Sequence, residues 1–87
     1  MNKYTNGMSA WKEDKNHLIK EFKLNSFKQI TEKLIEIAKI ADKMDHHPDF
    51  EVFNYNKIKF KIQTHTHKTV TELDYKLAAE IDKILSL

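Results

Sequence analysis

Apolar residues recur at spacings of three and four in two parts of the chain, which is the periodicity of an amphipathic helix. The first segment runs from about Ser26 to Met44, and Ser26 with Gln29 has the spacing of a capping box at its start. Its apolar positions are Phe27, Ile30, Leu34, Ile37, Ala41 and Met44. Further apolar residues widen this surface and indicate a second buried contact, for which a partner chain is one explanation; they are Ile35, Ala38 and Ile40.

The second helical segment runs from about Glu72 to Leu85. Thr71 is the expected N-cap, and Asp74 occupies the third helical position, where a carboxylate interacts favourably with the helix dipole. The residues expected on the buried face of this helix are Leu73, Leu77, Ile81, Ile84 and Leu85.

Two strand patterns lie between the helices. From Lys57 to Thr64, apolar and polar residues alternate as they do in a strand with one buried face. A β-rich run over residues 52–55 precedes it, and Asn56-Lys57 is the expected hairpin turn. The aromatic residues expected in the core are Phe27, Tyr55 and Phe60.

The N-terminal part carries two weaker signals. Leu18 to Leu24 has the pattern of a strand, and Trp11 begins another strand or a loop. The resulting order, ββαββα, predicts an α+β fold of two layers, in which a four-stranded antiparallel sheet is covered on one face by helices. We expect residues 1–10 to form a flexible N-terminus and residues 11–87 to form a single domain.

Composition narrows the possible functions. All 15 basic residues are lysine and the net charge is only +2, which argues against nucleic-acid binding because arginine is the usual reader of guanine. A single glycine, Gly7, excludes glycine-rich phosphate loops. The chain has no cysteine, no signal peptide and no apolar run long enough for a membrane span, so we expect an intracellular, cytoplasmic protein. A domain of this size is marginally stable alone, which favours oligomerisation.

Four of the five histidines fall in the segment 46–67. The unperturbed pKa of histidine is about 6.5, so a histidine cluster suits proton transfer or metal binding better than a hydrophobic core. His46 and His47 end the first helix, which Pro48 stops, and His65 follows the strand that begins at Lys57. If the hairpin packs on that helix, these histidines converge at one end of the sheet.

The spacing of these residues resembles that of the pterin-4a-carbinolamine dehydratase family. Three residues separate Asp42 from His46-His47-Pro48, and the aromatic Tyr55, the pair Thr64-His65 and Asp74 follow at family-like intervals. The chain departs from the usual pattern in a missing or short leading helix, in one extra residue before the aromatic and in Phe50 and Thr69, where tryptophan and glycine are typical.

The resemblance implies a hydro-lyase that converts 4a-hydroxytetrahydropterin to quinonoid dihydropterin and water for tetrahydrobiopterin recycling, with no metal or other cofactor. It implies a pterin substrate and a homo-oligomer, a dimer or a tetramer made of two dimers. The catalytic residues that it implies are His46, His47 and His65. The residues that it implies for binding the pterin are Asp45, Pro48, Gln63, Thr64 and Thr66.

Two carboxylates have supporting roles with structural alternatives. Asp74 has the place of a capping residue. Asp42 lies four residues before His46, so a helical ion pair between them explains its position equally well. Two other functions stay open. One is a protein-interaction module, since animal members of the family promote dimerisation of a transcription factor. The other is a metal-binding protein that uses His46, His47, His65 and His67.

Overall fold

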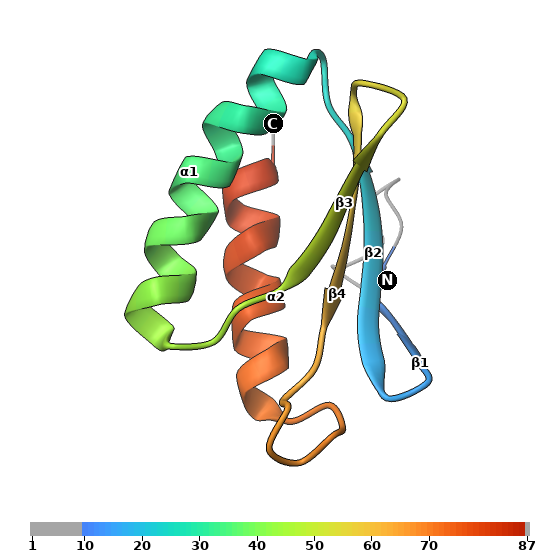
Figure 1. Ribbon diagram of the computed structural model, residues 1–87, viewed down its shortest axis with the longest axis vertical. Coiled ribbons are helices and arrows are strands. Elements are labelled where there is room, and N and C mark those ends of the chain that lie inside the picture. The colour runs from blue at the N-terminus through green and yellow to red at the C-terminus, as the bar shows by residue number, and fades with distance from the viewer. Residues whose placement is uncertain (1–9, 87) are drawn as a thin grey trace.

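The computed structural model describes residues 10–86, so the predicted flexibility of residues 1–10 concerns positions that lie almost entirely outside the described part. The described chain forms two layers, with the helices on one side of an antiparallel sheet (Figure 1). This confirms the predicted α+β fold. The elements are β1 (Lys12–Asp14), β2 (His17–Lys23), α1 (Phe27–Met44), β3 (Asp49–Phe53), β4 (Lys57–Ile62) and α2 (Glu72–Leu85).

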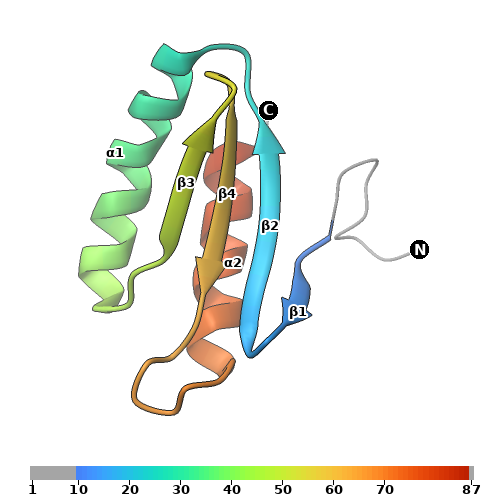
Figure 2. The same ribbon diagram turned by 45° about the vertical axis from the view of Figure 1, so that its right-hand side comes forward.

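The strand order β1-β2-β4-β3 determines which loops meet. Figure 1 shows α1 and α2 on the same side of this sheet, and in Figure 2 α2 lies behind β3 and β4. Asp49, the first residue of β3, pairs with Lys61 near the end of β4. The chain leaving α1 therefore reaches the sheet at the same end at which the chain leaves β4, and Tyr55 lies in the turn at the opposite end of the hairpin.

The core forms where the alternating face of β4 meets the two helices. Phe60 is fully buried, and its ring lies edge-on to Phe22 of β2 with centroids 5.9 Å apart. Such an arrangement adds roughly 0.5–1.5 kcal/mol beyond the buried area. The other members of the buried cluster are Leu18, Leu24, Ile30, Ile37, Ile58, Ile62, Leu77, Ala78, Ile81 and Leu85.

A charged pair also lies on the buried side of β2. Lys20 is only 5% exposed, and its Nζ donates to Oδ1 of Asp82 on α2 at 2.9 Å. The indole Nε1 of Trp11 donates to both oxygens of the same carboxylate at 3.1 Å. These contacts attach the chain before β1, as well as β2, to α2.

The ends of α1 follow local chemistry. Oγ of Ser26 accepts the N–H of Gln29 at 3.0 Å, which confirms the predicted N-cap, although the Gln29 side chain accepts from Asn25 at 2.8 Å. Asp45 has a left-handed backbone, with φ 52°, directly after the helix. The next N–H, of His46, donates to the carbonyl of Ala41 at 3.0 Å, a six-to-one bond that typically closes a helix.

The predictions of three core residues and of the hairpin turn were wrong. Phe27, Tyr55 and Leu73 are 57%, 67% and 44% exposed. Phe27 and Leu73 lie in the first turns of their helices, where their side chains are exposed to solvent. The hairpin turn spans residues 54–56 rather than Asn56-Lys57, and Tyr55 within it has φ 55°, which directs this aromatic away from the core.

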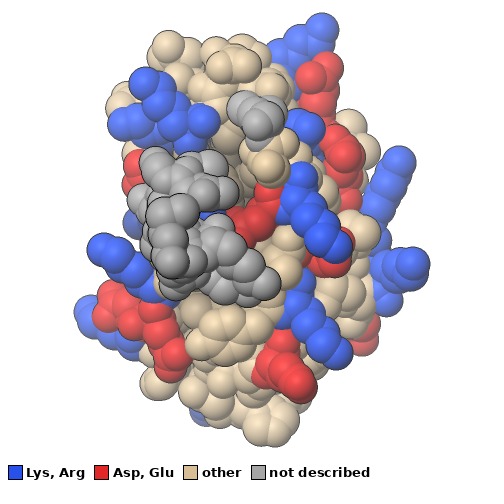
Figure 3. Space-filling view, turned by 180° about the vertical axis from the view of Figure 1, so that it is seen from behind, with Lys and Arg blue, Asp and Glu red and all other residues tan. Residues whose placement is uncertain are grey.

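One face of the molecule, seen from behind the view of Figure 1, carries lysines and acidic side chains side by side (Figure 3). On the sheet, Lys59 pairs across the strands with Glu21 on one side and Glu51 on the other. Within residues 10–86, neither helix is long and apolar enough to cross a membrane.

Candidate active site

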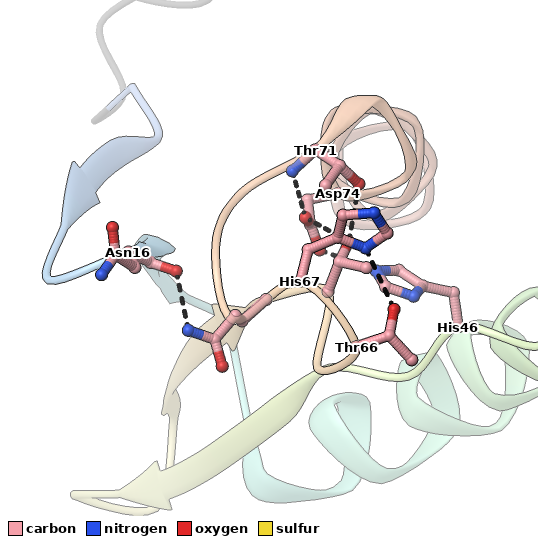
Figure 4. A network of polar contacts seen from close by, with 8 residues as sticks. Asn16, His46, Thr66, His67, Thr71 and Asp74 are labelled. Atoms are coloured by element: carbon pink, nitrogen blue, oxygen red, sulfur yellow. Dashed lines mark hydrogen bonds and ion pairs between the residues drawn. The ribbon is translucent and has the colours of Figure 1, made fainter.

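The end of α1 and the start of α2 meet through one buried hydrogen bond. Nε2 of His46 lies 2.7 Å from Oδ1 of Asp74, and the exposed fractions of the two side chains are 10% and 0%. His46 points inward because the left-handed residue Asp45 turns the chain back beneath the helix. Figure 4 shows the imidazole, at the end of α1, directed toward the carboxylate at the first turn of α2.

The other oxygen of Asp74 accepts two further hydrogen bonds. The hydroxyl of Thr64 donates to Oδ2 at 2.8 Å, and the backbone N–H of Thr71 donates to it at 2.7 Å. The second contact belongs to the predicted capping box of α2. Three donors therefore surround a carboxylate that has no exposed surface.

These contacts control the charge of the buried carboxylate. Burial by itself raises the pKa of Asp74, because the charged form loses its hydration. The hydrogen bond from His46, followed by those from Thr71 and Thr64, has the opposite effect. Together with the charge of His46, these bonds outweigh burial and hold the pKa of Asp74 below its ordinary value of 3.8. The group is therefore a carboxylate at neutral pH and acts only as an acceptor.

The second histidine of the pair faces solvent. Nε2 of His47 lies 2.8 Å from Oδ1 of Asp42, and the two side chains are 56% and 77% exposed. The predicted pairing of Asp42 with His46 was therefore wrong. Its basis was an uninterrupted helix, whereas the left-handed turn at Asp45 sends His46 inward and returns His47 toward α1.

An apolar groove adjoins His47 between α1 and β3. Its volume is about 280 Å³, close to the lower limit of about 300 Å³ for small-molecule sites. Pro48 forms part of the groove wall, and Asp42 and His47 supply its polar groups. The remaining lining residues are Leu34, Ile37, Ala38, Ala41 and Phe50.

The third predicted catalytic histidine lies on an exposed turn. The N–H of Thr64 donates to the carbonyl of Thr69 at 3.0 Å, and the turn between them carries His65, Thr66 and His67 on the surface. The Thr66 hydroxyl and Nδ1 of His67 lie 3.0 Å apart. The bond from Thr64 to Asp74 thus joins the base of the turn that carries His65 to the carboxylate that holds His46.

The structure distributes the predicted pterin-binding residues among several roles. The hydroxyl of Thr64 is committed to Asp74, and the side-chain amide of Gln63 donates to the carbonyl of Asn16 at 3.2 Å. Asp45 and Thr66 are exposed, and Pro48 lines the groove. Among residues 10–86, no three histidine, aspartate or glutamate side chains are grouped closely enough to hold a metal ion.

Sequence reasoning missed one participant and one double role. Thr71 was expected only as a helix cap, yet its hydroxyl lies 2.6 Å from that of Thr64. Asp74 was expected as a capping residue, yet it also binds His46. The capping spacing of Thr71 and Asp74 was the available signal for this double role. A capping carboxylate uses one oxygen for the backbone N–H, so its second oxygen is free to accept from another donor.

Together, the fold and the site define a class of protein: a two-layer α+β domain with a histidine–carboxylate site where its helices meet. The family described as pterin 4 alpha carbinolamine dehydratase matches residues 1–84. A protein of Sulfolobus acidocaldarius, named as a candidate pterin-4-alpha-carbinolamine dehydratase, is 42% identical over 77 residues, which cover 88% of this chain and 84% of the relative. A Prochlorococcus marinus protein of the same name is 36% identical over 77 residues, or 88% and 80% of the two chains. This chain belongs to the pterin-4a-carbinolamine dehydratase family.

Solved structures agree with this assignment. The transcriptional coactivator/pterin dehydratase from Brucella melitensis superposes with a TM-score of 0.82 at 27% identity, covering 94% of this chain and 88% of that one. A pterin dehydratase-like protein identified as a RuBisCO assembly factor in the alpha-carboxysome superposes with a TM-score of 0.74 at 21% identity, covering 90% and 92%. The second likeness concerns the fold alone.

Proposed function

We propose that this protein dehydrates 4a-hydroxytetrahydropterin to quinonoid dihydropterin and water, with His46, His47 and His65 as its acid and base groups. The proposal includes a role in tetrahydrobiopterin recycling in the cytoplasm, as a homo-oligomer, and needs no metal or other cofactor. Family membership supports a dehydratase in general terms. The arrangement of the histidines supports this particular reaction.

The reaction requires two proton transfers. The C4a–O bond breaks as the leaving oxygen takes a proton and becomes water. A base removes the proton of N5, and the electrons of the N5–H bond form the C4a=N5 double bond. Positioned acids and bases with a pKa near neutrality typically contribute about 10²–10⁴-fold to such steps. We assign His46 and His65 to the two sides of the C4a hydroxyl and His47 to orienting the pterin or assisting proton transfer.

The bond of 2.7 Å between His46 and the fully buried Asp74 is the observation that carries this proposal. An imidazole that is oriented by a carboxylate has a defined protonation pattern, which acid–base chemistry needs. The apolar groove beside His47 offers a surface for a flat heterocycle. His65 follows directly after Thr64, which is bonded to the same carboxylate as His46.

The test is a direct assay of 4a-hydroxytetrahydropterin dehydration by the full chain, with and without a metal chelator. Equal turnover under both conditions supports the proposal. Activity that the chelator removes would instead support a metal-dependent role for the histidines. A folded protein without turnover would contradict the proposal and leave the interaction module as the better description.

Two variants from one turn make the assay specific. His65→Ala should lower kcat by roughly 10²–10⁴-fold if His65 is an acid or base. His67→Ala is the matched control, since both histidines are exposed on the turn between Thr64 and Thr69. Both variants should unfold at the wild-type denaturant concentration. Equal turnover by the two variants would contradict the role of His65.

One observation favours a second candidate, an interaction module. Phe27 and Ile35 on α1 are 57% and 60% exposed, so a partner that covered this helix would remove apolar surface of both from water, which is favourable. The same surface also suits the proposed homo-oligomer. Turnover and oligomeric state of a Phe27→Ser, Ile35→Ser double variant distinguish the enzyme from the interaction module. If the protein is an enzyme, the wild type has turnover and the variant mainly loses its oligomeric state. If it is only an interaction module, neither the wild type nor the variant has turnover.

A further inference from the structure

Hydrogen bonds from Thr71 through Thr64 and from His46 converge on the carboxylate of Asp74. The carboxylate of Asp74 can only accept, so the single hydroxyl hydrogen of Thr64 points to Oδ2. The hydroxyl of Thr64 must then accept from that of Thr71, at 2.6 Å. For the same reason, Nε2 of His46 carries the hydrogen in its bond to Oδ1. The bond from Thr71 to Thr64 is in series with the bond from Thr64 to Asp74, so it polarises and strengthens the latter.

We propose that Thr64 is a positioning residue, which fixes the carboxylate of Asp74 and thereby holds His46 in the tautomer with hydrogen on Nε2. Nδ1 is then the basic nitrogen that His46 offers to a ligand. This inference rests on the proposed function only where it concerns turnover, because the tautomer is a property of the free protein. It deepens that function by naming the atom of His46 that exchanges a proton.

The backbone leaves the ring of His46 little freedom. The N–H of His46 is bonded to the carbonyl of Ala41 at 3.0 Å, which fixes the start of the side chain. With Nε2 bonded to Asp74, the rotation of the ring is fixed as well. Among residues 10–86, Nδ1 of His46 has no hydrogen-bond partner. Every fully buried side-chain nitrogen or oxygen in that part of the chain has a partner, so Nδ1 is not fully buried. Nδ1 is therefore the nitrogen that remains accessible.

The hydroxyl of Thr64 is separable from the structural role of its backbone. The N–H and carbonyl of Thr64 close the turn through Thr69, His67 and Lys68. A Thr64→Val variant retains those backbone contacts and the shape of the side chain, and it loses the donor to Asp74 and the acceptor for the Thr71 hydroxyl. With one donor to Oδ2 removed, the carboxylate can rotate, and Nε2 of His46 loses its fixed acceptor.

The experiment compares Thr64→Val and Thr64→Ser with wild type by long-range ¹H–¹⁵N NMR of the histidine rings at neutral pH. We expect His46 of the wild type and of Thr64→Ser to carry hydrogen on Nε2 alone, and His46 of Thr64→Val to show a mixture of tautomers. Thr31→Val is the control, since that exposed hydroxyl only donates to the carbonyl of Lys28 and lies outside the site. If Thr64→Val does not fold, Thr64→Ala replaces it.

Turnover provides a second readout. Thr64→Val should lower kcat roughly 10-fold or more with little change in KM, and Thr64→Ser should restore it, because an imidazole in the wrong tautomer cannot transfer its proton. Hydrogen on Nδ1 of His46 in the wild type would overturn the inference, as would a Thr64→Val spectrum and kcat equal to wild type. A wild type without turnover would contradict the proposed function only, since the NMR result decides the positioning role independently.

Discussion

Nε2 of His46 lies 2.7 Å from Oδ1 of Asp74, so the segment that directly follows α1 is bonded to the first turn of α2. The same carboxylate accepts from Thr64, which follows β4. Three segments that are separate in sequence therefore meet at one buried charged group. Loss of this group should affect stability and function together, and the two effects can be distinguished by their dependence on pH.

Asp74→Asn should make stability less dependent on pH in the acid range. Because the pKa of Asp74 is lowered from 3.8 by folding, the unfolded chain binds more protons than the folded protein below that pH. The stabilisation by the carboxylate is therefore complete above pH 3.8 and is lost as the pH falls through the lower, folded pKa. At pH 7, we expect the free energy of unfolding of the variant to be about 1–3 kcal/mol lower, because an amide cannot satisfy all three donors.

Urea unfolding of Asp74→Asn and wild type at a series of pH values between 7 and the acid range measures this difference. The gap between the two proteins should narrow as the pH decreases below 3.8. The control is Asp45→Asn, since Asp45 is exposed and asparagine tolerates its left-handed backbone. A gap for Asp74→Asn that stays constant over the whole range would contradict the assigned pKa direction.

The buried pair of β2 and α2 should respond differently according to which partner is removed. Asp82→Leu leaves the ammonium of Lys20, whose side chain is 4% exposed, without a counter-charge, and should cost about 1–3 kcal/mol or more. Lys20→Met should cost less than about 1 kcal/mol, because Asp82 is partly exposed and still accepts from Trp11. Thermal or urea unfolding compares the two variants. Equal losses of unfolding free energy in the two variants would contradict a separate penalty for leaving the Lys20 ammonium without a counter-charge.

The fold could be predicted because each element has a local cause. The alternation of β4, the periodicity of α1 and the caps at Ser26 and Thr71 all concern residues within a few positions of one another. The errors arose where tertiary packing determines which side of an element is buried. Leu73 has helical spacing but lies on the exposed side of α2, because the buried side is centred on Asp74, Leu77 and Ile81.

The sequence indicated the residues of the candidate site but not which of them contact one another. The spacing placed His46 and Asp74 in one family-like set, with Asp74 as a capping and supporting residue, whereas their contact depends on how α1 packs against α2. The pairing of Asp42 depends on a single backbone angle, the φ of 52° at Asp45. Aspartate adopts this conformation less readily than glycine or asparagine, so the sequence contained little indication that the helix would turn there.

The N-cap of α1 provides a test of local stability far from the site. Ser26→Ala should reduce the free energy of unfolding by about 1 kcal/mol, because the N–H of Gln29 loses its acceptor. Thr31→Ala is the control in the same helix, where the exposed hydroxyl only donates to the carbonyl of Lys28. Alanine has the higher helix propensity, so Thr31→Ala should be neutral or slightly stabilising. Equal destabilisation by both changes would contradict the capping role.

The exposed pair of Asp42 and His47 should matter more for turnover than for stability. Surface ion pairs are worth about 0–1 kcal/mol, and these side chains are 77% and 56% exposed, so Asp42→Asn should leave the unfolding transition nearly unchanged. If the carboxylate orients His47 at the groove, Asp42→Asn should lower kcat/KM by at most about 5-fold, because an ion pair worth up to about 1 kcal/mol can contribute no more than that. His47→Ala should lower kcat/KM further, and adding Asp42→Asn to it should have no additional effect. Independent, multiplicative losses in the double variant would show that Asp42 acts on the reaction by a route other than His47.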